Sequence, residues 1–212
     1  MPLLTIFEVY KYAPVGKDYP SFRLSQQIPI AEQKFVRDYA GQDFWDYLTA
    51  NLIVYEDAPE WVCEGHDEGE MVTYMGAVYE SLEDDNASTP SENNGSWQLL
   101  PRFDVACIET VWDGYIAPYL ALMVYKRSLP YAGTLSHAGG VTVYDNVNKE
   151  QSAKGKDLSG VAESLENDAA AIIGNMVYWM DEGGGKNCVW PSGGLCGGLY
   201  FALKTTSRFY FR

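Results

Sequence analysis

Four cysteines and two histidines are the residues of this chain best suited to hold a metal ion. Cys63 and His66 have the C-x2-H spacing of a ligand pair, whereas Cys188 and Cys196 have the looser spacing C-x7-C. Zn²⁺ prefers thiolate sulfur and imidazole nitrogen, so a zinc site built from these four residues is one alternative. The other, which we expect, is that the cysteines are free thiols and that Cys107 packs in the core.

The side chains that could do acid–base or nucleophilic chemistry form no catalytic pattern. His66 and His137 lie among polar residues and are interpreted as surface histidines, because nothing in the sequence places an acid beside His137 to complete a triad. The glycines of Gly193–Gly198 follow no clear strand, as a phosphate-binding loop would require. Asp84 and Asp85 do not fit the spacing of an EF-hand loop. We therefore predict that the protein is not an enzyme and has no cofactor and no bound metal.

The block from Asn51 to Leu100 carries an unusual concentration of negative charge. It contains twelve acidic residues and no lysine or arginine. The whole chain has 29 acids and 15 bases, so the rest, with 17 acids against 15 bases, is nearly neutral. Inside the block the helical periodicity of the flanks gives way to β-type segments at Met71–Tyr74 and Ala77–Tyr79. A small β module inserted into a helical protein explains both changes.

The remainder of the chain is predicted to be helical. Thr5 and Glu8 form a capping-box pattern before a short helix, and Pro29 prevents a continuous helix further on. Apolar residues at helical spacing predict helices over 30–40, 43–51 and 157–180, and a longer one that begins after the N-cap Asp104 and ends with Lys126 and Arg127. A short strand is predicted at 141–144. The fold class is therefore mainly α, with a helical domain of residues 1–55 and 101–182, an inserted antiparallel β module of residues 56–100, and an extended tail of residues 183–212.

The glycine-rich tail ends in a set of aromatic residues that cannot form a core of their own. Such a segment either packs back as an edge strand or docks on a neighbouring subunit. We predict that these aromatic residues contribute to a subunit interface: Tyr200, Phe201, Phe209, Tyr210 and Phe211.

The formal net charge of −14 argues against a protein that grips nucleic acid through its phosphates. It is compatible with a protein that surrounds DNA without binding it, because a like-charged wall repels the phosphate backbone. No run of about 18 apolar residues and no signal-peptide pattern is present, so we expect no membrane contact and folding in a reducing cytoplasm.

The inserted block resembles the small chitin-binding type modules of carbohydrate-binding families 5 and 12. The resemblance rests on the string Glu70–Leu82 and the later tryptophan, where the matching residues are Val72, Tyr74, Gly76, Tyr79 and Trp97. Those modules stack exposed aromatic rings on sugars shortly after the second tyrosine, a region that here holds Glu83, Asp84 and Asp85. The expected role of Tyr74, Tyr79 and Trp97 is therefore a structural module core, with sugar binding as their weaker alternative.

The helical part resembles head–tail adaptor proteins of tailed bacteriophages, most of all those of phages infecting gut Bacteroidetes, including the crAss-like group. The segments that carry the likeness are LLTIFEVYKYAP at 3–14, KFVRDYAGQDFWDYL at 34–48, VWDGYIAPYLALMVYKRSLPYAG at 111–133, GGVTVYDN at 139–146 and a final long helix. The resemblance implies a helical connector that forms a twelve-fold ring beneath the portal.

This resemblance also implies partners and a location. The expected partners are further copies of the chain, the portal protein and further tail or ring proteins, while genomic DNA passes through without sequence-specific binding. The expected place is the virion, at the portal–tail junction, after synthesis in the host bacterial cytoplasm. The alternatives are a tail-associated protein that binds host glycans through the module and, as a weaker one, a metal-dependent enzyme using the cysteine and histidine set.

Overall fold

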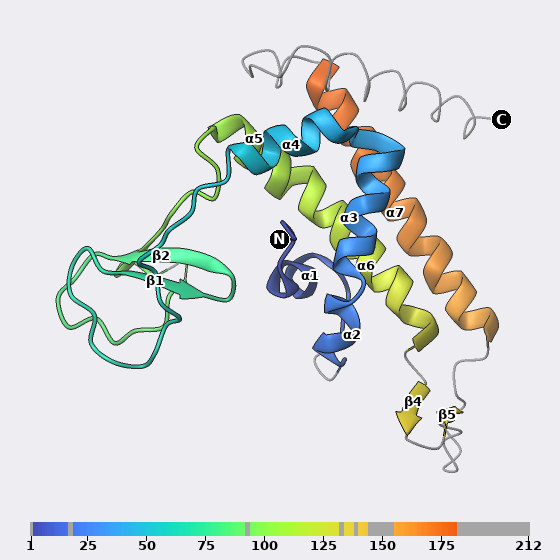
Figure 1. Ribbon diagram of the computed structural model, residues 1–212, viewed down its shortest axis with the longest axis horizontal. Coiled ribbons are helices and arrows are strands. Elements are labelled where there is room, and N and C mark those ends of the chain that lie inside the picture. Colours follow the sequence, from blue (N-terminus) through green and yellow to red (C-terminus); the bar gives the residue numbers. More distant parts are fainter. Residues whose placement is uncertain are drawn as a thin grey trace. The chain divides into compact units, whose positions relative to one another are not determined.

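The computed structural model describes residues 2–16, 19–91, 94–131, 134–137, 140–143 and 155–181. It divides into two compact units, one made of Met1–Phe44 with Val111–Arg212 and the other of Trp45–Thr110 (Figure 1). The first unit is mainly helical with one β-hairpin among its described residues, and the second contains the only three-stranded sheet of the described residues. A mainly α fold with a small antiparallel sheet was predicted, and the described residues confirm it at this level.

The predicted capping box is present at the start of α1 (Ile6–Tyr12). The Thr5 hydroxyl accepts a hydrogen bond from the Glu8 amide at 3.2 Å, and the Glu8 carboxylate accepts one from the Thr5 amide at 2.6 Å. The other Glu8 oxygen accepts a hydrogen bond from Trp112 Nε1 at 2.8 Å. One carboxylate thus caps α1 and ties it to a tryptophan far along the chain.

Two further short helices, α2 (Ser21–Ser25) and α3 (Ile28–Phe35), are separate, as Pro29 predicts. Pro29 occupies the first turn of α3, where its missing amide hydrogen is no loss. The side chain of Glu32, buried in α3, accepts hydrogen bonds from the amides of Leu3 and Leu4 at 2.7 and 2.8 Å. A π-helical turn, η1 (Val36–Ala40), then leads through Gly41 to α4 (Gln42–Ala50).

The long helix predicted from the Asp104 N-cap to Arg127 is confirmed, and a π-helical turn inside it was not predicted. The segment comprises α5 (Ala106–Val111), the π-helical turn η2 (Trp112–Ile116) and α6 (Ala117–Ser128). Pro118 lies in the first turn of α6 and has no amide hydrogen to donate to the preceding turn. A single π-helical turn next to such a proline commonly allows the helix to continue.

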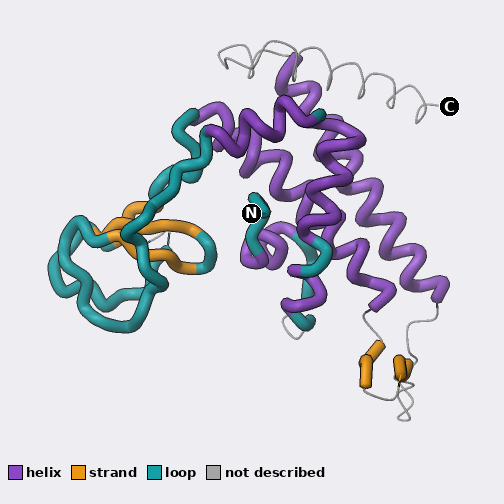
Figure 2. The backbone as a smooth tube through the Cα atoms, viewed as in Figure 1, coloured by secondary structure: helices purple, strands orange, loops and turns teal. Residues whose placement is uncertain are grey.

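Helix α6 is the centre of the helical unit, packed against α1, α2, α3 and α7 (Figures 1 and 2). Residues on nearly every side of α6 are buried, as expected of a helix enclosed by other helices. The Tyr119 ring packs at a tilt against Phe35 and edge to face against Tyr39, with centroids 5.4 and 5.6 Å away. Burial, with the Tyr39 side chain as the next cause, raises the pKa of the Tyr119 phenol far above its ordinary value. The buried residues of α6 are Ala117, Tyr119, Leu120, Ala121, Leu122, Met123, Val124 and Ser128.

The second predicted long helix is confirmed as α7 (Gly155–Asp181). Among its apolar residues at helical spacing, Leu165, Ala169, Ile173 and Met176 are buried, but Val161 is 42% exposed and does not belong to the core. The Lys126 ammonium of α6 donates a hydrogen bond to Glu166 of α7 at 2.6 Å, which lowers the pKa of that carboxyl below its ordinary value. Since Glu166 is largely exposed, this ion pair adds little to stability.

Between the two long helices lies a β-hairpin of β4 (Thr134–His137) and β5 (Gly140–Val143), paired antiparallel from Thr134↔Val143 to His137↔Gly140. The predicted strand at 141–144 corresponds to β5, whereas β4 was not predicted. None of the helices in the described ranges combines the length and apolar character needed to cross a bilayer.

Candidate functional site in the acidic module

The module is a three-stranded antiparallel sheet in the order β1 (Met71–Tyr74), β2 (Ala77–Ser81), β3 (Trp97–Leu99). The first two strands are those predicted from the sequence. Val72, Tyr79 and Trp97 form its buried core, and Tyr74 packs against them. Figure 2 shows that loops make up most of the module, so these few side chains hold much of it in place. Sheets this small need such a hydrophobic face to be stable.

The chain enters and leaves the module through two adjacent segments. Leu52 and Phe103 form an antiparallel bridge, the Ile53 amide donates to the Arg102 carbonyl at 2.9 Å, and the Asp104 amide donates to the Asn51 carbonyl at 3.1 Å. This paired segment, 51–53 with 102–104, is called the neck below. The two ends of the module therefore lie side by side. An inserted module requires this arrangement, because both of its ends must return to the same helical scaffold.

A carboxylate from α5 completes the neck. Glu109 accepts hydrogen bonds from the amides of Arg102 and Phe103, the second at 2.8 Å. Tyr55 adds a hydrogen bond from its hydroxyl to the Pro101 carbonyl at 2.8 Å. The described hydrogen bonds of Glu109 and Tyr55 thus hold the backbone of the neck and its neighbouring segment in place.

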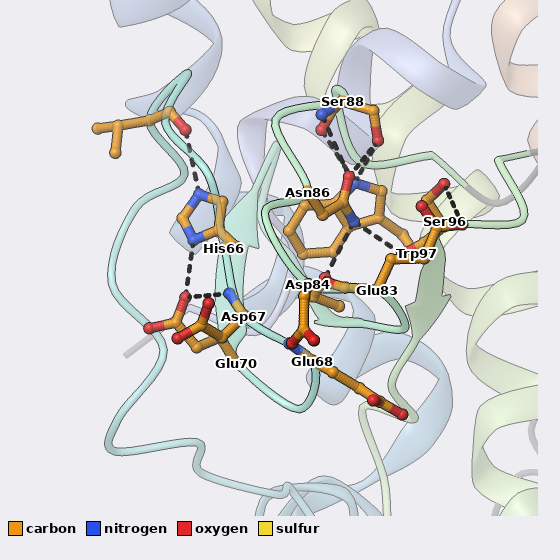
Figure 3. Close-up of polar contacts among 12 residues, drawn as sticks. His66, Asp67, Glu68, Glu70, Glu83, Asp84, Asn86, Ser88, Ser96 and Trp97 are labelled. Carbon is orange, nitrogen blue, oxygen red and sulfur yellow. Dashed lines mark hydrogen bonds and ion pairs between the residues drawn. The ribbon is translucent and has the colours of Figure 1, made fainter.

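A polar network centred on Asn86 organises the loops around β3 (Figure 3). The buried Asn86 amide nitrogen donates to Ser81 Oγ at 3.0 Å and to the Ser96 carbonyl at 2.8 Å, and its side-chain oxygen accepts from the Ser88 hydroxyl at 2.6 Å. Trp97 Nε1 donates to the Ser88 carbonyl at 2.9 Å. A buried amide with this many partners fixes loop geometry, and leaving the partners unpaired would be costly.

His66 was interpreted as a surface histidine, and that interpretation is wrong. The residue is only 8% exposed, and its ring lies edge-on to Trp97 with centroids 5.6 Å apart. Its Nδ1 is 3.3 Å from Glu70 Oε2 and its Nε2 is 3.1 Å from the Val62 carbonyl. Backbone hydrogen bonds in both directions join His66 to Asn86. Both ring nitrogens are therefore engaged within the module, and the histidine joins two loops.

The acidic side chains of the module lie on its surface. Among the described acids of this block all are exposed except Glu80, which is half-buried. Several of them hold the backbone: Glu70 accepts from the Asp67 amide at 3.0 Å, and Asp84 accepts from the Glu68 amide at 3.2 Å (Figure 3). The described residues contain no group of three metal-ligating side chains placed to hold an ion.

One close approach fixes the loop that carries these acids. Asp85 has a positive φ of 56°, and its side chain lies directly against Gly65, where an added Cβ would clash with it. A side chain at position 65 would therefore require the Asp85 carboxylate to move.

The cysteines differ from the expectation of four free thiols. Cys63 is free and exposed, but Cys107 is half-buried and disulfide-bonded, so its interpretation as a core thiol is wrong. Cys188 and Cys196 lie outside the described residues, which leaves the zinc alternative without a described ligand set. The tail aromatics proposed for a subunit interface, Tyr200, Phe201, Phe209, Tyr210 and Phe211, also lie outside the described residues.

The aromatic residues nearest the surface of the module are Trp61 and Tyr74. Their rings meet edge to face, 5.3 Å apart at 77°, and both residues are half-buried. Tyr79 and Trp97 are 8% and 3% exposed. Sugar recognition by stacking needs open ring faces, so two of the three weak sugar-binding candidates are hidden in the core. Trp61 packs against the module core together with Tyr74.

The turn between β1 and β2 contains an unusual residue. Met75 and Gly76 both have positive φ, 51° and 77°, which is the pattern of a type I′ hairpin turn that favours asparagine followed by glycine. Met75→Asn should therefore stabilise the module, by about 1 kcal/mol, because asparagine tolerates the left-handed conformation better. Met75 is 54% exposed, so little packing is lost.

Urea unfolding of the two proteins, followed by tryptophan fluorescence, measures this difference. A lower midpoint for Met75→Asn would mean that the buried part of the methionine contributes more than the turn strain removes.

Comparison of the chain with models of known protein families, with characterised proteins and with solved structures finds no match.

Proposed function

We propose that this chain is a structural subunit of a phage head–tail adaptor, a ring beneath the portal that connects capsid to tail and lets genomic DNA pass. The observation that carries the proposal is an acidic β module whose entering and leaving segments pair in a hydrogen-bonded neck, in a chain that divides into two compact units. Such a module can be added to a helical scaffold without disturbing it. The helices also follow the order in which the resembling adaptor segments occur.

The charge distribution supports a role next to DNA without tight binding. The module bears twelve acids and no base, so its surface repels phosphate. We place the module on the outside of the ring, because insertions are most easily accommodated at exposed loops. There its function is to contact the next tail or ring protein.

The alternative is a tail-associated protein that binds host glycans. The geometry gives it less support, because Tyr79 and Trp97 are buried and only Trp61 and Tyr74 are half-exposed. Specific binding on a glycan array, lost in Trp61→Ala, would favour this alternative over the ring.

The ring is tested by the mass and symmetry of the assembled particle. The purified full-length chain, alone and with the portal protein of the same phage, should give a closed ring of about twelve copies by native mass spectrometry and show rotational symmetry in class averages. A chain that stays monomeric or dimeric at every concentration, with and without the portal protein, would overturn the proposal.

A further inference from the structure

Strand β3 of the module has a neighbouring strand on one side only. It lies at the end of the order β1–β2–β3, and none of the isolated bridges of the described residues involves it. Strand β1, at the other end, is covered, because the Trp61 amide donates to the Thr73 carbonyl at 2.8 Å and the Thr73 amide donates to the Pro59 carbonyl at 2.7 Å. The outer side of β3, called the open edge below, has no such cover among the described residues.

The hydrogen bonds between β2 and β3 show which backbone groups point to the open edge. The Leu100 amide donates to the Val78 carbonyl at 2.9 Å, and Leu99 lies opposite Tyr79. In antiparallel pairing, a residue next to such a bond directs its own amide and carbonyl away from the paired strand. Both backbone groups of Leu99 therefore point to the open edge, and no described group pairs with them. The Trp97 amide, by contrast, is already bonded within a turn.

Exposed apolar and acidic side chains border the open edge. Leu99 is 40% exposed, and Leu82, whose amide donates to the Ser96 carbonyl at 3.0 Å, is 43% exposed. The exposed Glu83 carboxylate accepts a hydrogen bond from Ser96 Oγ at 3.0 Å (Figure 3). Since Ser96 directly precedes β3, these contacts place Leu82 and Glu83 beside that strand. A strand that adds to this edge should thus carry apolar and basic side chains.

The tail of the same chain has this composition. Residues 183–212 contain four bases and no acid, whereas the block 51–100 contains twelve acids and no base. Within the tail, residues 200–212 hold three of the bases, Lys204, Arg208 and Arg212, and the five aromatic residues predicted to contribute to a subunit interface. This segment has no glycine and no proline, and its aromatic residues and threonines favour the β conformation. Charge and β propensity thus make it the complement of the open edge.

We propose that residues 200–212 of one copy add to the open edge of β3 in the next copy as a further strand. This inference rests on the proposed ring and assigns its subunit contact. Hydrogen bonds to the backbone of Leu99 position the segment, its apolar side chains cover Leu82 and Leu99, and its bases meet the acids of the module. Because two different parts of the chain meet, the contact is heterologous and can close into a ring.

Photochemical cross-linking identifies the contact directly. Full-length chains carrying p-benzoylphenylalanine in place of Leu99 are assembled with an excess of isotope-labelled wild-type chains and irradiated. Mass spectrometry should find position 99 joined to peptides from residues 200–212 of the labelled chains, since the tail comes from another copy. The same photoreactive residue in place of Met75, which is 54% exposed in the turn between β1 and β2, is the matched control and should not capture the tail.

Substitutions on each side of the contact test its two components, with assembly measured by analytical ultracentrifugation. Leu99→Pro removes the outward amide but not the bond from Leu100 to Val78, and should weaken assembly about ten-fold, more than Leu99→Ala, which keeps the amide. Lys204→Glu should also weaken it about ten-fold, most clearly at low salt, whereas Lys186→Glu makes the same change in charge outside the segment and should not. Hydrogen exchange verifies that the module of each variant is folded.

The outcomes separate this inference from the ring itself. A ring in which position 99 captures no tail peptide, or which tolerates both Leu99→Pro and Lys204→Glu, overturns the assigned contact and leaves the ring standing. Cross-links to residues 200–212 of unlabelled chains alone, despite the excess of labelled ones, would show that the tail covers its own module, and this also overturns the contact between copies. A wild-type chain that never assembles overturns the ring and the contact together.

Discussion

Replacing Trp112 with alanine should lower the free energy of unfolding of the helical unit by about 3–5 kcal/mol, the range for deleting a large buried aromatic side chain. Trp112 is completely buried in η2. Its Nε1 donates to Glu8 Oε1 at 2.8 Å, and Glu8 also caps α1 through Thr5. The substitution therefore leaves a cavity and removes one anchor of α1.

Urea unfolding followed by far-ultraviolet circular dichroism measures this loss, and two variants divide it into parts. Trp112→Phe keeps much of the ring but removes the donor to Glu8, so it should lose about 1–3 kcal/mol. Tyr178→Ala, at a 65% exposed position of α7, should change the stability of the free chain by less than about 0.5 kcal/mol. A loss under about 1 kcal/mol for Trp112→Ala would show that this tryptophan is not part of the core.

The elements that the sequence predicts well are those determined by near neighbours. The capping box of Thr5 and Glu8, the separation of α2 from α3 at Pro29, and the hairpin around Gly76 each depend on residues within a few positions. Strand pairing in the module follows from the same local signals, since a two-residue turn fixes the register of the strands it joins.

What the sequence does not predict depends on distant contacts or on backbone detail. His66 has polar neighbours along the chain, but its backbone pairs with Asn86 and its ring packs on Trp97, and both lie far from it in the sequence. The π-helical turn η2 before Pro118 was not predicted, because the apolar spacing continues unbroken on both sides of it. That Cys107 is disulfide-bonded likewise cannot be derived from the spacing of the cysteines along the chain.

The sequence predicts which types of residue make up the acidic module, but it predicts their arrangement in space only in part. The acidic surface follows directly from the residue counts, and Trp97 and Tyr79 were expected in a module core, where they lie. The density of serine and asparagine in 86–96 suggests a polar hydrogen-bond network. It does not indicate which of these residues is buried. Only the fold brings Asn86 to the centre, since its partners come from β2 and from the loop before β3.

The module should unfold by itself when Trp97 is replaced with alanine. Trp97 is 3% exposed, is one of three residues in the module core, and donates from Nε1 to the Ser88 carbonyl at 2.9 Å. Losing it should destabilise the module by about 3–5 kcal/mol. Three short strands cannot sustain a loss of that size. The helical unit has its own core and should remain folded, because the two units are separately compact.

Hydrogen–deuterium exchange read by mass spectrometry distinguishes the two units directly. In Trp97→Ala, peptides from about Glu60 to Leu100 should exchange as fast as an unfolded chain, while peptides from α6 and α7 keep wild-type protection. Trp61→Ala is the matched control: the same residue type in the same module, but half-buried, so the module should stay protected. If α6 and α7 lose protection together with the module, the units fold as one cooperative domain and the insertion model fails. If the module keeps its protection without Trp97, its stability comes from the Asn86 network and the neck rather than from its aromatic core.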